Sequence, residues 1–231
     1  MISSPRDIEL DVGPDLGRVS ALLTRPHDAW LLYILAHGAG AGMRHRFMET
    51  IAVALSDRGV ATLRYQFPYM ETGGRRPDSP AVAEATVRAA ARHGAELEPE
   101  LPMIAGGKSF GGRMTSGAAA KSLPGVRGLA FLGFPLHPPG RPGISRADHL
   151  DNIEAPMLFL QGTRDQFAGR HLITEVCGRL APRATLHLVD DADHSFAVPK
   201  RAGRPASSVL DELADTLAGW ARSNVLGLDR P

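Results

Sequence analysis

Short apolar segments alternate with longer amphipathic segments along most of the chain. Six of the short segments have the length and aliphatic content of strands, and several are apolar at every position, as strands buried on both faces are. These six segments are Trp30–Ala36, Val60–Tyr65, Leu101–Ala105, Val126–Leu132, Met157–Leu160 and Thr185–Val189. Two segments nearer the N-terminus, Asp7–Val12 and Val19–Thr24, are predicted to form an antiparallel hairpin at the sheet edge.

The segments between these strands carry apolar residues at helical spacing. We expect helices over Met43–Arg58, Pro80–His93, Phe110–Lys121, Arg170–Leu180 and Ser207–Ala221, and a short turn at Asp148–Ile153. Strands that alternate with helices are typical of a mostly parallel sheet with helices on both faces. The pattern therefore predicts a single α/β domain over residues 1–231, with about seven or eight strands. Residues 224–231 are expected to form a loose tail.

The connection between the strands Val126–Leu132 and Met157–Leu160 is rich in proline and glycine. Its segment Pro135–Gly143 cannot form a long helix, because proline interrupts helical hydrogen bonding. We expect an ordered loop there, and therefore only a minimal lid over the sheet.

The charge balance limits the kinds of partner that this chain is expected to bind. The net charge is +1, with acidic and basic residues well mixed, which favours neither a nucleic-acid partner nor a membrane partner. The N-terminal segment Met1–Val12 is acidic and lacks the apolar run of a signal peptide. Cys177 is the only cysteine, so no internal disulfide can form, and we expect a cytoplasmic protein. The sequence does not indicate an oligomeric state.

One segment has the pattern of a nucleophile on a sharp turn. Residues 107–111 read Gly-Lys-Ser-Phe-Gly, a G-x-S-x-G motif placed between a predicted strand and a predicted helix. Glycines two positions on either side of the serine let the strand and the helix approach closely. Such a turn exposes the Ser109 hydroxyl and puts the backbone N–H of Phe110 at a helix N-terminus.

Two other interpretations of this motif compete with the nucleophile. A serine can stand by chance in a glycine-rich turn, so the motif depends on its strand–turn–helix context. Gly107-Lys108-Ser109 is also the end of a P-loop, but Pro102 stands where that motif has its first glycine. The loop before Lys108 is therefore too short to surround a phosphate.

A serine nucleophile needs a base and an orienting carboxylate, which in this kind of fold follow it in the order acid, then histidine. Of the five histidines after Ser109, His194 alone lies in a loop directly after the last predicted strand. Asp165 ends the turn after the buried strand Met157–Leu160, and we assign it as the acid. The rival carboxylates Asp190, Asp191 and Asp193 are close to His194 in sequence and are expected to shape its loop instead.

The segment His37–Gly42 reads His-Gly-Ala-Gly-Ala-Gly and follows a buried strand. A glycine-rich turn at this place can aim a backbone N–H at the nucleophile, as the second donor of an oxyanion hole beside Phe110. Ala39 is the first candidate for this donor, and Gly40 is the alternative. His37 is expected to anchor the turn rather than to act as a base.

Five sequence elements in this order resemble a known family. They are AHGAGAG (36–42), GGKSFGGRM (106–114), LGFPLHPPGRP (132–142), LQGTRDQF (160–167) and DADHSF (191–196). Together they resemble the dienelactone-hydrolase-related branch of the α/β-hydrolase superfamily, close to uncharacterised hydrolase-like domains that include one in a subunit of the nonspecific lethal chromatin complex. The resemblance implies the α/β-hydrolase fold and the triad Ser109, Asp165 and His194. Dienelactone hydrolases use a cysteine nucleophile, so their substrate is not implied here.

The sequence therefore predicts a serine hydrolase that acts on a small ester or thioester, with no cofactor and no metal, because no ligand-type residues cluster at metal-binding spacing. Phe67, Phe134 and Phe167 follow predicted strands and are candidates to line the substrate pocket. Arg141, and also Arg113, are candidates to attract an anionic substrate. The alternative hypothesis is a non-catalytic interaction module that has kept the hydrolase fold.

Overall fold

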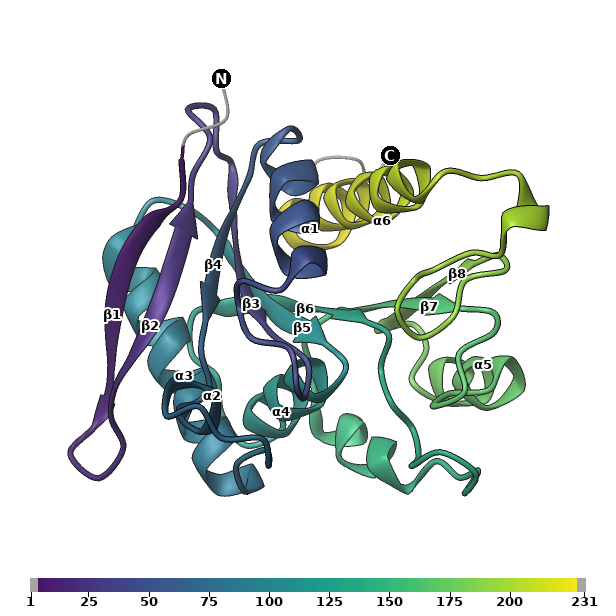
Figure 1. The fold of residues 1–231 in the computed structure, drawn as a ribbon, viewed down its shortest axis with the longest axis horizontal. Helices are drawn as coiled ribbons and strands as arrows, with labels where there is room; N and C mark the ends of the chain where they lie inside the picture. The colour runs from purple at the N-terminus through teal and green to yellow at the C-terminus, as the bar shows by residue number, and fades with distance from the viewer. Residues whose placement is uncertain (1–3, 228–231) are drawn as a thin grey trace.

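The computed structural model describes residues 4–227, which form one eight-stranded sheet with helices on both faces (Figure 1). The strand order is β1-β2-β4-β3-β5-β6-β7-β8. The strands are β1 Arg6–Gly13, β2 Gly17–Thr24, β3 Leu31–Ala36, β4 Val60–Tyr65, β5 Met103–Lys108, β6 Val126–Leu132, β7 Met157–Gly162 and β8 Ala184–Val189. The pairs β1–β2 and β2–β4 are antiparallel, and the remaining neighbouring pairs are parallel. The predicted α/β fold class, with its mostly parallel sheet and edge hairpin, is confirmed.

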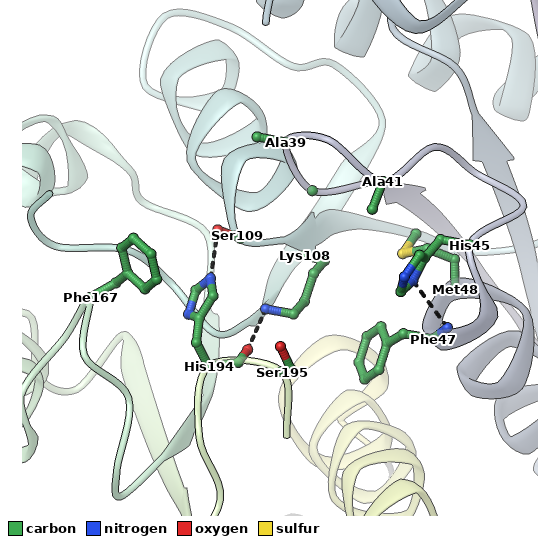
Figure 2. Close-up of a pocket in the computed structure, with 11 residues that line it drawn as sticks. Ala39, Ala41, His45, Phe47, Met48, Lys108, Ser109, Phe167, His194 and Ser195 are labelled. Atoms are coloured by element: carbon green, nitrogen blue, oxygen red, sulfur yellow. Dashed lines mark hydrogen bonds between the residues drawn. The ribbon is translucent and has the colours of Figure 1, made fainter. Parts of the chain in front are cut away.

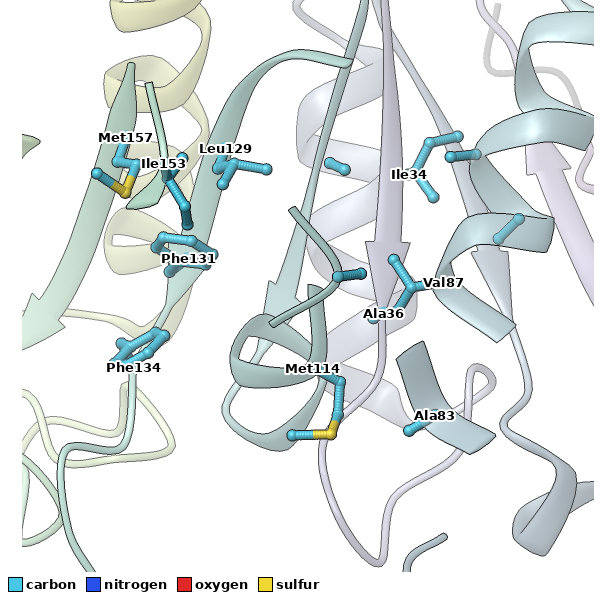
Figure 3. Packing of buried hydrophobic residues seen from close by; sticks show 14 of the residues in the cluster. Ile34, Ala36, Ala83, Val87, Met114, Leu129, Phe131, Phe134, Ile153 and Met157 are labelled. Carbon is cyan, nitrogen blue, oxygen red and sulfur yellow. The ribbon is translucent and has the colours of Figure 1, made fainter. Parts of the chain in front are cut away.

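The helices cover the two faces of the sheet because alternate residues of each central strand point to opposite sides. The helices α1 (Arg46–Ser56) and α6 (Ala206–Ala221) pack on one face, and α3 (Pro80–Leu97), α4 (Phe110–Ala119) and α5 (Arg170–Arg179) pack on the other. In β3, for example, Ile34 and Ala36 contribute to the core beneath α3 and α4, as Figure 3 shows beside Val87 and Met114. Tyr33 and Leu35 contribute to the core beneath α1 and α6.

Several boundaries differ from the prediction. Helix α1 begins at Arg46 rather than Met43, because the His45 side chain caps it by accepting a hydrogen bond from the N–H of Phe47. Strand β5 extends to Lys108, directly before Ser109. The short segments α2 (Pro68–Glu71), η1 (Ser145–Asn152) and η2 (Lys200–Ala202) were predicted only in part or not at all. A π-helical turn, η3 (Arg222–Leu226), includes residues 224–226 of the predicted loose tail, whereas 228–231 lie outside the described residues.

The connection from β6 to β7, residues 133–156, has the 3₁₀ helix η1 as its regular structure, and residues 135–143 form a loop. Residues 133–156 therefore contribute no large helical lid to the carboxyl edge of the sheet. Of the helices within residues 4–227, none is both long and apolar enough to span a membrane.

The topology makes the carboxyl ends of β3 and β5 the natural place for a site. The chain passes from β3 to β4 on one side, whereas β5 pairs with the other side of β3. In open α/β sheets ligands bind at the carboxyl ends of strands where the direction of connection reverses in this way. The loops that follow β3, β5, β7 and β8 carry His37–Gly42, Ser109, Asp165 and His194, respectively.

Candidate active site

Ser109 lies between the last residue of β5 and the first residue of α4, with φ 49° and ψ −110°. Side chains other than glycine rarely adopt this backbone conformation, and where they do the surrounding structure must hold it. Here the Ser109 N–H donates to the carbonyl of Leu132 at 3.1 Å, and the Ser109 carbonyl accepts from the N–H of Arg113 at 3.1 Å. The strand runs directly into this turn, so there is no loop of the length that a P-loop needs. The turn presents the serine hydroxyl at the carboxyl edge of the sheet.

The three residues predicted as a triad lie within hydrogen-bonding distance of one another. His194 Nε2 is 2.8 Å from Ser109 Oγ, and His194 Nδ1 is 2.7 Å from Asp165 Oδ2. Because a carboxylate only accepts hydrogen bonds, Nδ1 carries the proton and donates it to Asp165. Nε2 is then unprotonated and can accept the hydroxyl proton of Ser109. The arrangement can therefore convert a weakly nucleophilic hydroxyl into an activated one.

Asp165 is held in place by two further donors. Its side chain is fully buried. Oδ1 accepts the N–H of Phe167 at 2.8 Å, and Oδ2 accepts the amide Nε2 of Gln161 at 2.5 Å. Gln161 is itself fixed, because its Oε1 accepts the N–H of Phe134 at 2.9 Å. Sequence reasoning missed Gln161, since a glutamine within an apolar strand carries no sign of the residue that it faces.

Of the neighbouring carboxylates, that of Asp193 bonds within the loop that carries His194. Asp193 Oδ1 accepts the backbone N–H groups of Ser195 and Ala197 and so shapes the loop that carries His194. Asp191 adopts a positive φ of 57° in the turn after β8, where its own N–H donates to Thr163. Neither of them takes the place of Asp165 beside the imidazole.

The N–H groups of Ala39 and Phe110, the two predicted oxyanion donors, have no acceptor within residues 4–227. Phe110 is the first residue of α4, where backbone N–H groups point out of the helix and attract negative charge. The alternative donor, Gly40, is engaged, because its N–H donates to the hydroxyl of Tyr69 at 3.2 Å. Ala39 and Phe110 therefore remain the candidate donors to a developing oxyanion.

His37 is fully buried beneath the glycine-rich turn. Its Nε2 accepts the N–H of Phe67 at 3.1 Å, which leaves Nδ1 as the protonated nitrogen that donates to the carbonyl of Gly38 at 2.8 Å. Burial lowers the pKa of His37 from 6.5 to about 4, so the ring is neutral at neutral pH. His37 thus ties the start of the turn to Phe67 in the segment after β4, and both of its ring nitrogens are engaged in these bonds.

Because His37 is buried and neutral, we expect the protein to lose stability in acid. Its folded-state pKa lies below its unfolded value, so its contribution is complete above about pH 6.5 and is lost as the pH falls to about 4. The expected loss is about 3 kcal/mol in the free energy of unfolding. Urea titrations at pH 7 and pH 4 check this when wild type is compared with His37→Asn. The stability difference between the two proteins should shrink by that amount in acid, and an unchanged difference would contradict the prediction.

A pocket of about 360 Å³ opens beside Ser109 and His194 (Figure 2). The first turn of α1 supplies one wall through Phe47 and Met48, and Phe167 supplies another beside the imidazole, with ring centroids 4.3 Å apart. The remaining lining residues are Gly38, Ala39, Ala41, His45, Lys108 and Ser195. The pocket therefore has mostly apolar walls, and its polar side chains are those of His45, Lys108, Ser109, His194 and Ser195.

Of the four residues predicted to contact substrate, only Phe167 lines this pocket. Phe67 is fully buried and packs edge-on against His37 and Phe110. Phe134 is also fully buried and packs against Phe131 and Phe159 in the core. Arg141 is exposed on the loop after β6 and is not part of the lining. Contrary to the prediction, Phe67, Phe134 and Arg141 therefore do not line the pocket beside Ser109.

A second serine–histidine pair lies elsewhere and lacks the geometry for activation. Ser116 Oγ is 2.8 Å from His149 Nε2, but the Ser116 hydroxyl donates to the carbonyl of Arg113 at 2.8 Å. His149 must therefore donate to Ser116 and cannot act as its base. Arg113 lines a separate pocket between α3, α4 and η1. Within residues 4–227 no group of three or more histidine, cysteine or acidic side chains is arranged to hold a metal.

Comparison with known proteins agrees with this fold. A family model described as an alpha/beta hydrolase domain matches residues 29–222. The esterase domain of a Rhodothermus marinus protein superposes with a TM-score of 0.73 at 20% identity, covering 96% of this chain and 100% of that one. An alpha/beta serine hydrolase without lid from Xanthomonas campestris gives 0.73 at 21% identity, covering 94% and 95%. A dienelactone hydrolase from Anabaena variabilis gives 0.73 at 18% identity, covering 96% and 100%. At these identities the likeness is one of fold.

Proposed function

Because this chain belongs to the alpha/beta hydrolase domain family, we propose that it is a serine hydrolase that cleaves a small ester or thioester through an acyl-enzyme intermediate. The observation that carries the proposal is the continuous hydrogen-bonded chain from Ser109 through His194 to Asp165, beside an open pocket. The serine hydrolase and esterase names of the structural neighbours agree with it.

In the first step Ser109 Oγ attacks the carbonyl carbon of the substrate while His194 Nε2 takes the hydroxyl proton. The carbonyl oxygen becomes an oxyanion that accepts hydrogen bonds from the N–H groups of Ala39 and Phe110. Each such donor contributes about 3 kcal/mol to lowering the barrier. His194 then gives its proton to the departing alcohol or thiol, and the acyl group remains on Ser109.

In the second step water attacks the acyl-enzyme, with His194 again as the base, and the acid product leaves as Oγ regains its proton. Asp165 stays ionised throughout and stabilises the imidazolium that forms in each step. No cofactor enters these steps. The size of the pocket suits a short acyl group, since ligand pockets for larger molecules extend to about 1,000 Å³.

The proposed partner and cellular location are those that the sequence predicts. A small acyl compound is the proposed partner, and no nucleic-acid or membrane partner is proposed, in keeping with the net charge of +1. A cytoplasmic location is in keeping with Cys177, a free and buried cysteine.

A fluorophosphonate probe tests the proposal directly, because it phosphonylates only activated serines. We expect mass spectrometry to find the adduct on Ser109 in wild type. Ser109→Ala should abolish the adduct by removing the nucleophile, and His194→Ala should abolish it by removing the base. Hydrolysis of short-chain p-nitrophenyl esters should be lost in the same two variants.

Ser116→Ala is the matched control, because Ser116 also contacts a histidine but donates its own proton to a backbone carbonyl. This variant should be labelled on Ser109 as wild type is. A folded wild-type protein that resists the probe would count against the proposed triad. The interaction-module alternative would then lead, and a search for binding partners would replace the substrate screen.

A further inference from the structure

Lys108 places a positive charge inside the pocket. The residue is the last of β5, and its side chain extends through the pocket to the carbonyl of His194, where Nζ donates at 2.6 Å (Figure 2). Nζ also lies 5.6 Å from the centre of the Phe196 ring. An ammonium has three N–H donors, and one of them is used by His194, so two remain for other acceptors.

No carboxylate within residues 4–227 pairs with this ammonium. The two acidic groups that act on it most strongly from nearby are Asp165 and Asp193. Asp165 is bonded to His194, Gln161 and the N–H of Phe167, and Asp193 accepts two backbone N–H groups. Burial lowers the pKa of Lys108 to about 8, so the group is still mostly protonated at pH 7.

The rest of the pocket supplies no negative group either. Phe47, Met48 and Phe167 are apolar, and the Nδ1 of His45 accepts the N–H of Phe47. Ser195, which also lines the pocket, has a hydroxyl that can donate. A partly buried ammonium without a counter-ion is costly, and a ligand that brings the opposite charge lowers that cost.

We propose that Lys108 selects substrates that carry a carboxylate a few carbon atoms from the scissile carbonyl, such as half-esters of short dicarboxylic acids. This inference rests on the proposed function, because it concerns what the same serine cleaves. It assigns to Lys108 the anion-binding role that sequence reasoning gave to Arg141.

The expected spacing follows from the contacts of a single residue. His194 touches Ser109 with its ring and Lys108 with its backbone carbonyl. The ammonium and the nucleophile are therefore separated by about one histidine residue. A carboxylate bound at Nζ and a carbonyl carbon at Ser109 Oγ must bridge that separation, which a chain of a few methylene groups does.

Matched substrates test the charge without changing the shape. Monoethyl glutarate is compared with its neutral carboxamide, and the butyrate ester of glycolate with that of glycolamide, so the charge lies on the acyl side in one pair and on the alcohol side in the other. We expect wild type to favour the charged member of at least one pair by about 10- to 100-fold in kcat/KM, the range for a charge-assisted hydrogen bond. Lys108→Met should abolish that preference, and Lys108→Arg should retain most of it.

Arg141→Met is the matched control, because it removes an exposed cation outside the pocket, and it should leave the preference intact. If Lys108 only supported the His194 loop, Lys108→Met would slow both members of a pair equally and the wild-type preference would persist. That result overturns the inference, as does the absence of any preference in wild type.

Calorimetry separates this inference from the proposed function. Glutarate is the product of monoethyl glutarate hydrolysis, and its binding can be measured without catalysis. It should bind wild type more tightly than glutaramide does, and Lys108→Met should lose this difference in affinity. Equal binding of the two compounds by wild type overturns the selectivity even if Ser109 is labelled by the fluorophosphonate probe. Selective glutarate binding without labelling of Ser109 would overturn the proposed hydrolysis and keep the anion site.

Discussion

Replacing Asp165 with asparagine is expected to lower kcat for ester hydrolysis by about 10⁴-fold while leaving the fold intact. The change removes the charge that stabilises the imidazolium of His194. It also replaces a group that only accepts hydrogen bonds with one that has a donor side and an acceptor side. The contacts around Asp165 explain why neither orientation of the asparagine amide can replace all the hydrogen bonds of the carboxylate.

In one orientation the amide oxygen accepts the N–H of Phe167, and the amide NH₂ faces His194 and Gln161. The imidazole must then accept at Nδ1 and carry its proton on Nε2, where it can no longer receive the proton of Ser109. The NH₂ group of Gln161 then faces a second donor. The Gln161 amide cannot rotate by 180° to avoid it, because its oxygen already accepts the N–H of Phe134. In the flipped orientation the tautomer is preserved, but the amide NH₂ opposes the N–H of Phe167 in a buried place.

The measurement is kcat for a short-chain ester, with thermal unfolding recorded beside it. Asp191→Asn is the matched control, because Asp191 has a positive φ that asparagine also tolerates and its carboxylate lies outside the triad. That variant should keep nearly the wild-type rate. An equal loss of kcat in both variants would indicate disturbance of the loops rather than loss of the Asp165–His194 interaction. A small loss of kcat in Asp165→Asn would remove Asp165 from the proposed mechanism.

The fold and the proximity of the three candidate catalytic residues can be predicted from the sequence, because both depend on strand order. Buried strands such as β3 are apolar throughout, and the residues directly after parallel strands meet at one edge. Ser109, Asp165 and His194 each lie in a segment that follows a parallel strand, so their meeting needs no knowledge of side-chain direction. The glycine-rich turn before Gly42 is recognisable for the same reason.

Side-chain direction is the part that the sequence does not predict. Phe67 and Phe167 both follow strands, yet Phe67 packs in the core against His37, whereas the Phe167 ring lies tilted against that of His194 in the pocket wall. The pocket wall instead comes from Phe47, in the first turn of α1, where helical spacing alone suggests a core position. The sequence suggests only a P-loop role for Lys108, although the strand's pleat turns its side chain into the pocket.

Gly106→Ala is expected to destabilise the protein by at least about 4 kcal/mol, a size that point substitutions reach only through severe clashes or buried polar losses. Gly106 pairs with Ala130 across the parallel strands β5 and β6. A Cβ at this position would lie 1.7 Å from the carbonyl oxygen of Ala130 and 3.0 Å from the hydroxyl of Tyr33. That hydroxyl donates to the same carbonyl at 2.7 Å in a buried place, so a shift of β6 also breaks this bond.

Urea unfolding checks this prediction, with Gly178→Ala as the control. Gly178 lies in α5, where a Cβ would have no other atom within 4 Å, so alanine there should stabilise the helix by about 0.5 to 1 kcal/mol. The double variant Gly106→Ala/Tyr33→Phe separates the two clashes, and it should recover little, because the backbone oxygen of Ala130 remains in place. Substantial recovery of stability would mean that the clash with Tyr33, and not that with the backbone of β6, causes most of the loss. The close approach of β5 and β6 also fixes Ser109, whose N–H donates to Leu132 of β6, so any Gly106→Ala protein that does fold should label poorly with the fluorophosphonate probe.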